Sequence, residues 1–198
     1  MGKAEENKRL KRVAILDAAL QLFTDQGWSK TSISDIAARS GVAKGTFYLY
    51  FKDKYDIRNK LVIHQSRKLL RSAYEAMTAA GLSGLEAQFI FLANYVLDVL
   101  NQRKELLLLI SKNLSWGILR RELEEGDDAF FSAFQAMTEP CGIRPPRSEI
   151  LLYLLVEFIG SSCYSAILYS EPCSLEALKP YLFESVRRII RQFREESL

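Results

Sequence analysis

The chain has 198 residues, of which 48% are hydrophobic and 26% are charged, and its net charge is +3. This apolar content excludes a disordered chain, and the length is sufficient to bury a sizeable core in one or two domains. No uninterrupted apolar run reaches the roughly 18 residues that a membrane-spanning helix needs, and residues 1–12 are polar rather than an apolar signal sequence. These features predict a cytoplasmic protein with no membrane partner.

The positive charge is concentrated in the first part of the chain. Residues 1–60 hold 12 Lys and Arg against 7 Asp and Glu, a balance of +5, whereas the rest holds 15 against 17, a balance of −2. A basic region of this kind attracts nucleic-acid phosphates without regard to sequence. The alternative is a solvated, lysine-rich tail.

The first sixty residues have the pattern of a small helical domain. Leu16, Ala19 and Phe23 recur at helical spacing within a predicted helix over 6–26, which Gly27 ends. Thr31 and Ser32 then provide hydroxyl groups that can cap a second helix, and Gly41 ends that helix in a left-handed turn. A third short helix follows over 43–50. Two short helices around a tight turn form a helix-turn-helix, whose second helix enters the DNA major groove.

The same residues resemble the signature of the TetR family of bacterial transcription regulators. The matching positions are Thr31-Ser32, Ile36-Ala37, Gly41-Val42, Gly45-Thr46-Phe47-Tyr48-Leu49-Tyr50-Phe51 and Lys54, preceded by Ile15 to Ala19, Phe23 and Gly27-Trp28. The resemblance covers about the first quarter of the chain. It implies an all-α fold with an N-terminal three-helix DNA-binding domain over 1–53 and a C-terminal helical ligand-binding and dimerisation domain over 54–198.

The resemblance also implies which residues contact a double-stranded DNA operator. They are Ser32, Ser34, Lys44, Gly45, Thr46, Tyr48, Tyr50 and Lys54. Lys44 and Thr46 are expected at base edges or phosphates, Tyr48 and Tyr50 at the backbone, and Lys54 at a phosphate. Gly45 permits close backbone approach. Ser34 is shorter than the polar side chains of some relatives, so base reading rests on fewer residues.

The remainder of the chain is also predicted to be helical. The expected helices cover 54–80, which links the two domains, and then 85–101, 104–113, 116–124, 127–138, 146–169 and 175–196. Pro180 is an awkward residue inside the last helix, because proline removes a backbone hydrogen bond and clashes with the preceding turn. The last helix therefore has an alternative start near Pro180.

The last two helices are apolar on more than one face, which favours a homodimer. The resemblance implies that they pair with their copies in a four-helix interface, placing two reading helices one DNA turn, roughly 34–36 Å, or a multiple apart. The residues expected in this interface are Leu151, Leu155, Phe158, Ser162, Leu182, Val186, Ile189 and Phe193. The alternative is an ordinary monomer core.

The middle of the chain is rich in aromatic residues, and the resemblance implies a cavity there for a small, largely apolar effector. The candidate lining residues are His64, Phe89, Asn94, Tyr95, Asn113, Trp116, Phe134, Tyr153 and Glu157. Ligand pockets combine an apolar wall with a few polar groups, which is why the set includes both kinds. The implied function is a repressor released by this ligand. The alternatives are a regulator without an inducer, whose C-terminal domain only dimerises or binds a protein, and plain core packing of the aromatics.

No enzyme, cofactor or metal site is predicted. His64, Cys141, Cys163 and Cys173 lack the short paired spacing of zinc ligands, and the chain has neither a phosphate-binding loop nor a nucleophile elbow. The acidic run around Gly126 is interpreted as a solvated turn. The cysteines are expected to be reduced and mostly structural, with a redox role only if Cys141 or Cys173 is exposed.

Overall fold

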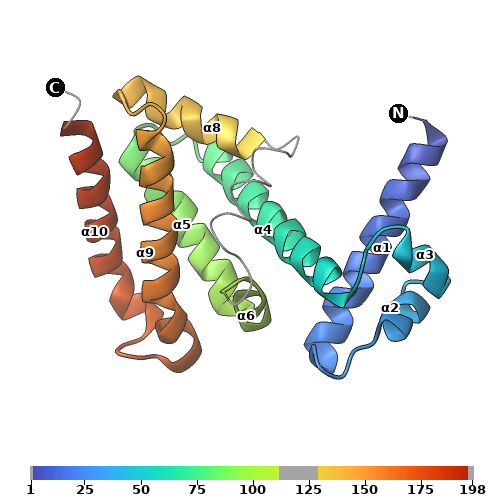
Figure 1. Cartoon of the computed structure of the whole chain (residues 1–198). Helices are drawn as coiled ribbons and strands as arrows, with labels where there is room; N and C mark the ends of the chain where they lie inside the picture. The colour runs from blue at the N-terminus through green and yellow to red at the C-terminus, as the bar shows by residue number, and fades with distance from the viewer. Residues whose placement is uncertain (1, 112–128, 196–198) are drawn as a thin grey trace. The chain divides into compact units, whose positions relative to one another are not determined.

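The computed structural model describes residues 2–111 and 129–195, and every regular element in those two segments is a helix (Figure 1). The chain divides into two compact units, Met1–His64 and Gln65–Leu198. This division falls inside the fourth helix, whereas the boundary expected from the sequence lies at its start, between residues 53 and 54. The expected helix over 116–124 lies outside the described residues.

The first unit contains α1 (Lys3–Asp25), α2 (Ile33–Arg39), α3 (Lys44–Tyr48) and the first turns of α4 (Lys54–Ala79). Its core is made of apolar side chains from all four helices and from the loop after α3: Ile15, Ala19, Ile36, Phe47, Phe51, Ile57 and Leu61. The rings of Phe47 and Phe51 lie 5.5 Å apart. Burial of this face holds α2 and α3, which are too short to be stable alone, in a fixed arrangement.

The turn around α2 forms through local hydrogen bonds. Ser32 caps the helix, because its Oγ accepts from the Asp35 N–H at 3.1 Å while the Ser32 N–H donates to Asp35 Oδ2 at 2.8 Å. This reciprocal pair is a capping box. The hydroxyl of Thr31 does not cap the helix, because it is buried and donates to the Gly27 carbonyl at 2.9 Å, which closes the preceding loop. Gly41 follows α2 with φ +71°, the left-handed turn that the sequence predicts.

The second unit contains the rest of α4 with α5 (Leu85–Gln102), α6 (Lys104–Ser111), α8 (Ala129–Thr138), the short 3₁₀ helix η1 (Glu139–Cys141), α9 (Arg147–Tyr169) and α10 (Leu175–Glu195). Helices α9 and α10 run side by side, and both contact α5. One core cluster joins α5, α6, α9 and α10 around Leu97 and Ile167, and the other joins α5, α8, α9 and α10 around Phe89 and Leu155.

Helix α10 begins at Leu175 and continues through Pro180, so the alternative start near Pro180 is wrong. The helix starts early because Ser174 caps it: its Oγ accepts from the Ala177 N–H at 3.3 Å. Pro180 is exposed, which leaves the carbonyl that loses its usual N–H partner accessible to water.

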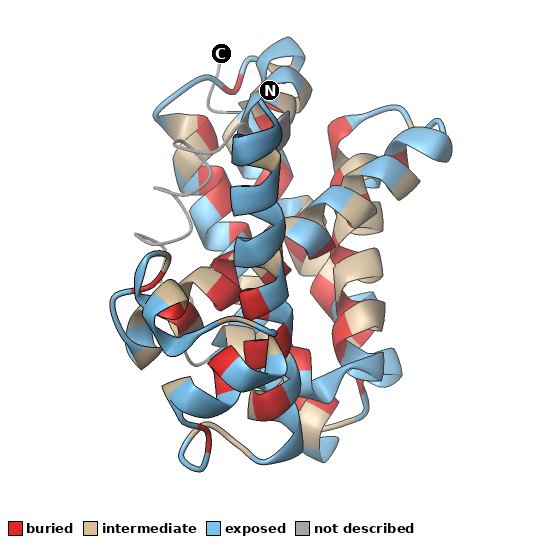
Figure 2. Ribbon diagram, turned by 90° about the vertical axis from the view of Figure 1, so that its right-hand side faces the viewer, coloured by how far each residue is buried: buried red, intermediate tan, exposed pale blue. Residues whose placement is uncertain are grey.

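Helix α9 is long and apolar enough to cross a membrane by length and composition alone. A core helix of a water-soluble protein has the same properties. One side of α9 is buried against its neighbours, including Leu151, Leu155, Cys163 and Ile167. Figure 2 shows buried residues beside exposed ones along the helices of the chain.

Candidate functional site

The short helix α3 presents a mixed basic, hydroxyl and aromatic surface. It buries only Phe47, which leaves Lys44, Gly45 and Tyr48 exposed and Thr46 half-buried. Tyr48 is 51% exposed although it is a large aromatic residue. A Cβ added at Gly45 would meet no atom within 4 Å, so nothing inside the unit requires glycine there. This surface suits contact with another molecule.

The other predicted DNA contacts lie near α3 in the sequence but differ in exposure. Ser32 and Ser34 are exposed at the start of α2, whereas Tyr50, which follows α3, is half-buried. The structure therefore brings the hydroxyl groups of α2 and the side chains of α3 into one small unit. Whether they touch DNA stays a prediction.

Lys54 is held by its own domain. Its ammonium group donates to the Trp28 carbonyl and lies 4.3 Å from the centre of the Trp28 ring. Partial burial lowers the pKa of Lys54, and the nearby Asp35 carboxylate opposes that effect. The predicted phosphate contact would have to share this ammonium group with Trp28.

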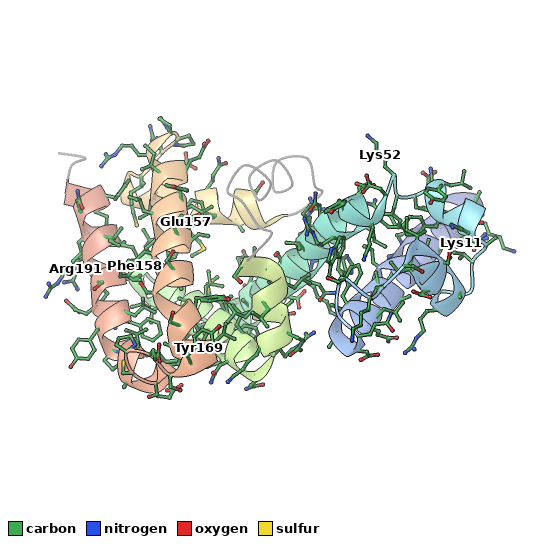
Figure 3. The ribbon with its side chains drawn as sticks, turned by 60° about the horizontal axis from the view of Figure 1, so that its bottom comes forward. Lys11, Lys52, Glu157, Phe158, Tyr169 and Arg191 are labelled. Atoms are coloured by element: carbon green, nitrogen blue, oxygen red, sulfur yellow. The ribbon has the colours of Figure 1, made fainter. Side chains whose placement is uncertain are left out.

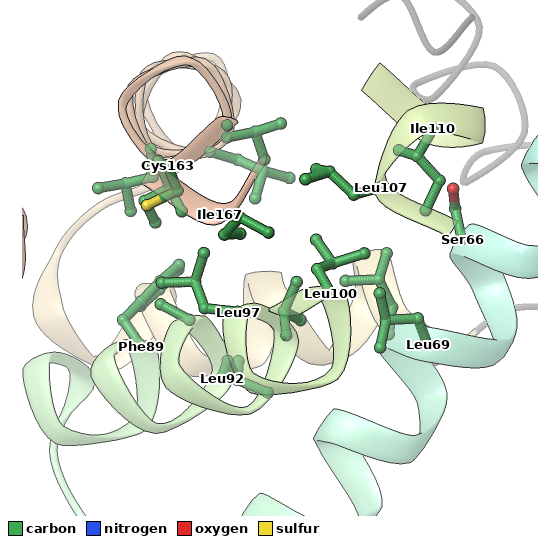
Figure 4. A pocket seen from close by; sticks show the side chains of 18 residues that line it. Ser66, Leu69, Phe89, Leu92, Leu97, Leu100, Leu107, Ile110, Cys163 and Ile167 are labelled. Carbon is green, nitrogen blue, oxygen red and sulfur yellow. The ribbon is translucent and has the colours of Figure 1, made fainter. Parts of the chain in front are cut away.

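The second unit contains an apolar cavity of about 220 Å³ between α4, α5, α6 and α9 (Figure 4). Eighteen residues line it: Ser66, Leu69, Leu70, Phe89, Leu92, Ala93, Val96, Leu97, Leu100, Leu107, Ile110, Leu152, Leu155, Val156, Ile159, Gly160, Cys163 and Ile167. Only Ser66 and Cys163 bring a side-chain heteroatom to this lining, and no lining residue is charged. Burial raises the pKa of Cys163 to about 11, with the Lys179 ammonium opposing that effect.

Phe89 is the one described member of the predicted ligand set that lines this cavity. Phe134 is buried behind it, with the two rings edge to face at 5.5 Å, and Tyr95 is half-buried against the core. Asn94 lies in a separate, more open depression with Glu86 and Arg187, and donates to Asp98 Oδ2 at 2.9 Å.

The remaining predicted ligand residues lie elsewhere. His64 is the last residue of the first unit, and Tyr153 and Glu157 are exposed residues of α9, where Figure 3 labels Glu157. Tyr153 and Glu157 are exposed, whereas Leu152 and Leu155 of the same helix are buried at the cavity, so a role for the two polar residues in ligand binding stays a prediction. Asn113 and Trp116 lie outside the described residues.

The residues predicted for the dimer interface fall into two groups, one buried within the single chain and one half-buried. Leu151, Leu155, Leu182 and Val186 are at most 2% exposed within this single chain, so their side chains are already covered. Within the single chain these four side chains belong to the core between α9, α10 and their neighbours, and their part in a dimer interface stays a prediction. Phe158, Ser162, Ile189 and Phe193 are half-buried. The exposed large apolar residues of the two helices, apart from the cavity-lining Val156, include Ile150, Tyr153, Leu154 and Tyr181.

No group of three or more His, Cys, Asp or Glu side chains in the described segments is arranged to hold a metal ion. The three cysteines are free: Cys163 is buried, while Cys141 and Cys173 are half-buried.

Sequence reasoning also missed a basic surface at the beginning of α1. Lys8, Lys11 and Arg12 are exposed there, and their three- and four-residue spacing was the available signal.

Comparison with known proteins gives a family for the N-terminal domain. The sequence profile described as bacterial regulatory proteins of the TetR family matches residues 15–61. The fatty acid metabolism regulator protein of Bacillus subtilis is 46% identical over 52 residues, which are 26% of this chain and 27% of that protein. The probable acrEF/envCD operon repressor of Escherichia coli is 27% identical over 135 residues, 62% of this chain and 60% of that protein. The matches thus span about a quarter to three fifths of these relatives.

Solved structures show the same fold over nearly the whole chain. A TetR-family transcriptional regulator from Streptomyces coelicolor superposes with a TM-score of 0.64 at 18% identity, covering 95% of this chain and 99% of that one. FadR from Bacillus subtilis, solved with stearoyl-CoA, gives a TM-score of 0.62 at 19% identity, covering 88% and 96%. Together, the helix-turn-helix and the profile match identify residues 15–61 as a DNA-binding domain of the TetR family, and the superpositions show that the chain has the fold of TetR-family regulators.

Proposed function

We propose that this regulator binds a palindromic operator as a homodimer in the cytoplasm, represses transcription there, and leaves the DNA when a small, largely apolar ligand enters the cavity of the second unit. The observation that carries the ligand part is the uncharged cavity of about 220 Å³ between α4, α5, α6 and α9. An apolar cavity of about 150 Å³ in another protein stays dry and binds benzene, so this volume accommodates a small hydrophobic group.

The DNA part of the proposal rests on the exposed surface of α3. Lys44 and Thr46 contact base edges or phosphates, and Tyr48 and Tyr50 contact the backbone. Ser32 and Ser34 add hydroxyl groups at the start of α2. Such contacts combine sequence-independent attraction with positioning in the major groove.

The homodimer forms through the exposed sides of α9 and α10. Ile150 and Leu154 are 49% and 41% exposed, and Tyr181 is 76% exposed. Exposed apolar residues on two adjacent helices favour an interface rather than solvent. Pairing of this face with its copy makes a four-helix contact and gives the two-fold symmetry that a palindrome requires.

An acyl chain is the ligand chemistry that this cavity suits. Hydrocarbon chains need apolar walls and few polar partners, which matches a lining of aliphatic side chains with one serine and one cysteine. Two similar proteins support the choice: one is named a fatty acid metabolism regulator, and FadR was solved with stearoyl-CoA. Because the lining has no charged residue, a polar head group on such a ligand must lie outside the cavity.

Helix α4 provides the connection between ligand and DNA. Its first turns bury Ile57 and Leu61 in the first unit, and its later residues Leu69 and Leu70 line the cavity. A ligand that displaces Leu69 and Leu70 shifts the helix that carries the DNA-binding unit. Release requires the ligand to prefer the conformation that does not bind DNA.

The DNA contacts are tested by binding to fluorescent DNA from the gene's own upstream region. Lys44→Ala/Tyr48→Ala is expected to weaken binding at least tenfold, because it removes a cation and a backbone contact. Lys68→Ala/Tyr169→Ala is the matched control, since it removes the same residue types from exposed positions in the second unit. Equal binding by both variants would contradict the assigned interface.

The ligand part is tested by release of that DNA with palmitate or stearoyl-CoA, with coenzyme A alone as the control. Ala93 lines the cavity, so Ala93→Phe fills part of it. This variant is expected to keep DNA binding and lose the ligand response. If neither probe changes DNA affinity in the wild-type protein while both bind it, the regulator without an inducer becomes the better description.

A further inference from the structure

The first three turns of α1 extend beyond the packed part of the first unit. The helix begins at Lys3, yet its first buried residue is Ile15. Residues 3–14 are exposed apart from the half-buried Glu6 and Val13. Figure 2 shows these turns almost entirely pale blue below the N-terminus. A polar helical segment of this kind contributes nothing to the apolar core of its unit, so its side chains are available for contact with another polar molecule.

The charges on this segment are not evenly arranged around the helix. Residues 3–14 contain five Lys and Arg against two Glu, a balance of +3. Arg9 pairs with Glu6 at 2.7 Å on one side of the helix. Lys8, Lys11 and Arg12 lie on another side, where they precede Ile15 and Ala19 at steps of three and four residues.

This spacing places Lys8, Lys11 and Arg12 on one face of α1. Residues three and four apart share one face of a helix. The face formed by Ile15 and Ala19 is the one that α1 buries in its own unit, where it contacts α2. Lys8, Lys11 and Arg12 continue this face past the edge of the core. Helix α3 lies beside α1 in Figure 1, and Lys11 lies at the same end of the unit as α3 in Figure 3.

We propose that the Lys8, Lys11 and Arg12 face of α1 binds DNA phosphates that flank the base pairs reached by α3. The inference rests on the DNA binding described above and adds a contact outside the matched family profile, which begins at residue 15. Charge complementarity selects the occupant, because an exposed row of cations beside a reading helix meets the phosphate backbone. The contact extends the footprint and carries no base specificity.

The test compares two double variants with equal change of charge in the full-length protein. Lys8→Gln/Lys11→Gln removes two cations from the proposed face. Lys3→Gln/Arg9→Gln removes two from other sides of the same turns. Glutamine has nearly the helix propensity of lysine and arginine, so the helix is preserved, and far-UV circular dichroism checks this. Binding is measured over a salt series of roughly 50–200 mM on the upstream DNA bound by wild type, and on the same site with its flanks trimmed.

Each phosphate contact contributes about 0.9 to the slope of log affinity against log salt, so the first variant is expected to reduce the slope by about 1.8 per protomer. The second variant is expected to keep the wild-type slope. On trimmed DNA the difference between wild type and the first variant should disappear.

Two results would overturn the proposal. The slope of Lys8→Gln/Lys11→Gln could equal that of wild type, or the control variant could lose as much slope, which would indicate diffuse attraction rather than a defined contact. Failure of the DNA-binding function itself looks different, because wild type would then not bind the upstream DNA, or Lys44→Ala/Tyr48→Ala would bind it unchanged.

Discussion

Cys163 provides a direct chemical test of whether the cavity is dry and apolar. Its side chain lines the cavity and is 2% exposed. Burial disfavours the thiolate and raises the pKa of Cys163 from 9.0 to about 11. The thiolate is the reactive form of cysteine, so the rate at which Cys163 is modified depends on how polar its surroundings in the cavity are.

The magnitude follows from the two pKa values. At pH 8 the thiolate fraction of Cys163 is about 100-fold lower than that of an unburied thiol with the ordinary value. A thiol reagent should therefore modify the folded protein at least about 100-fold more slowly than the unfolded chain, and exclusion of the reagent adds to this factor. A bound acyl chain should slow the reaction further.

The same shift makes stability depend on pH. The folded state holds the Cys163 proton more tightly than the unfolded state, so this contribution is complete below pH 9. It is lost as the pH rises from 9 to 11, by at most about 2.7 kcal/mol. Cys163→Ser should remove this part of the alkaline loss of stability.

The assay uses a Cys141→Ser/Cys173→Ser variant, in which Cys163 is the remaining cysteine. Modification by a chromogenic disulfide is followed from pH 7 to pH 10, with the same variant in urea as the control. Equal rates in the folded and unfolded protein at pH 8 would refute the reasoning, because the cavity would then be open to water. If a saturating acyl ligand left the rate of Cys163 modification unchanged, the ligand would not bind in this cavity.

Three further outcomes follow from contacts in the structure. Ser32→Ala removes the capping box with Asp35 and should cost about 1 kcal/mol, measured as a lower Tm in thermal unfolding. Asp98→Ala removes the carboxylate 2.5 Å from the Lys179 ammonium and should cost about 1 kcal/mol in urea unfolding, because Asp98 is partly exposed and Lys179 keeps its ion pair with Glu176. If the two residues act as a pair, adding Lys179→Met should cost less than the sum of the single changes. Leu154→Glu places a charge on the exposed side of α9 and should shift sedimentation from dimer to monomer, and an unchanged dimer would exclude that face.

The order and type of the helices are largely predictable because their signals are local. Ser32 and Gly41 mark the two ends of α2, and their chemistry acts within a few residues. The start of α10 was harder to predict, because Pro180 suggests a later start and only the cap at Ser174 explains the earlier one. Helix α1 begins three residues before its expected start at residue 6, because a polar segment has no apolar period to detect.

The exposed surface of α3 was predictable for a related reason. Helix α3 has one apolar residue to bury, Phe47, so Lys44 and Tyr48 are exposed in any arrangement that covers that ring. The cavity was not predictable. Its lining comes from four helices, and Leu152 and Tyr153 are neighbours in the sequence, yet Leu152 is buried at the cavity and Tyr153 is exposed.

The sequence by itself determined that the chain is helical, where most helices begin and end, and that its first quarter carries a helix-turn-helix, because caps, turns and short helices depend on neighbouring residues. Only the tertiary structure decided which apolar face of α9 and α10 is core and which is exposed. Both faces are apolar, so periodicity cannot distinguish Leu151 from Ile150 or Leu155 from Leu154. Which face is core depends on which neighbouring helix covers it. The same packing of helices leaves the cavity lined by Phe89, Leu97 and Cys163.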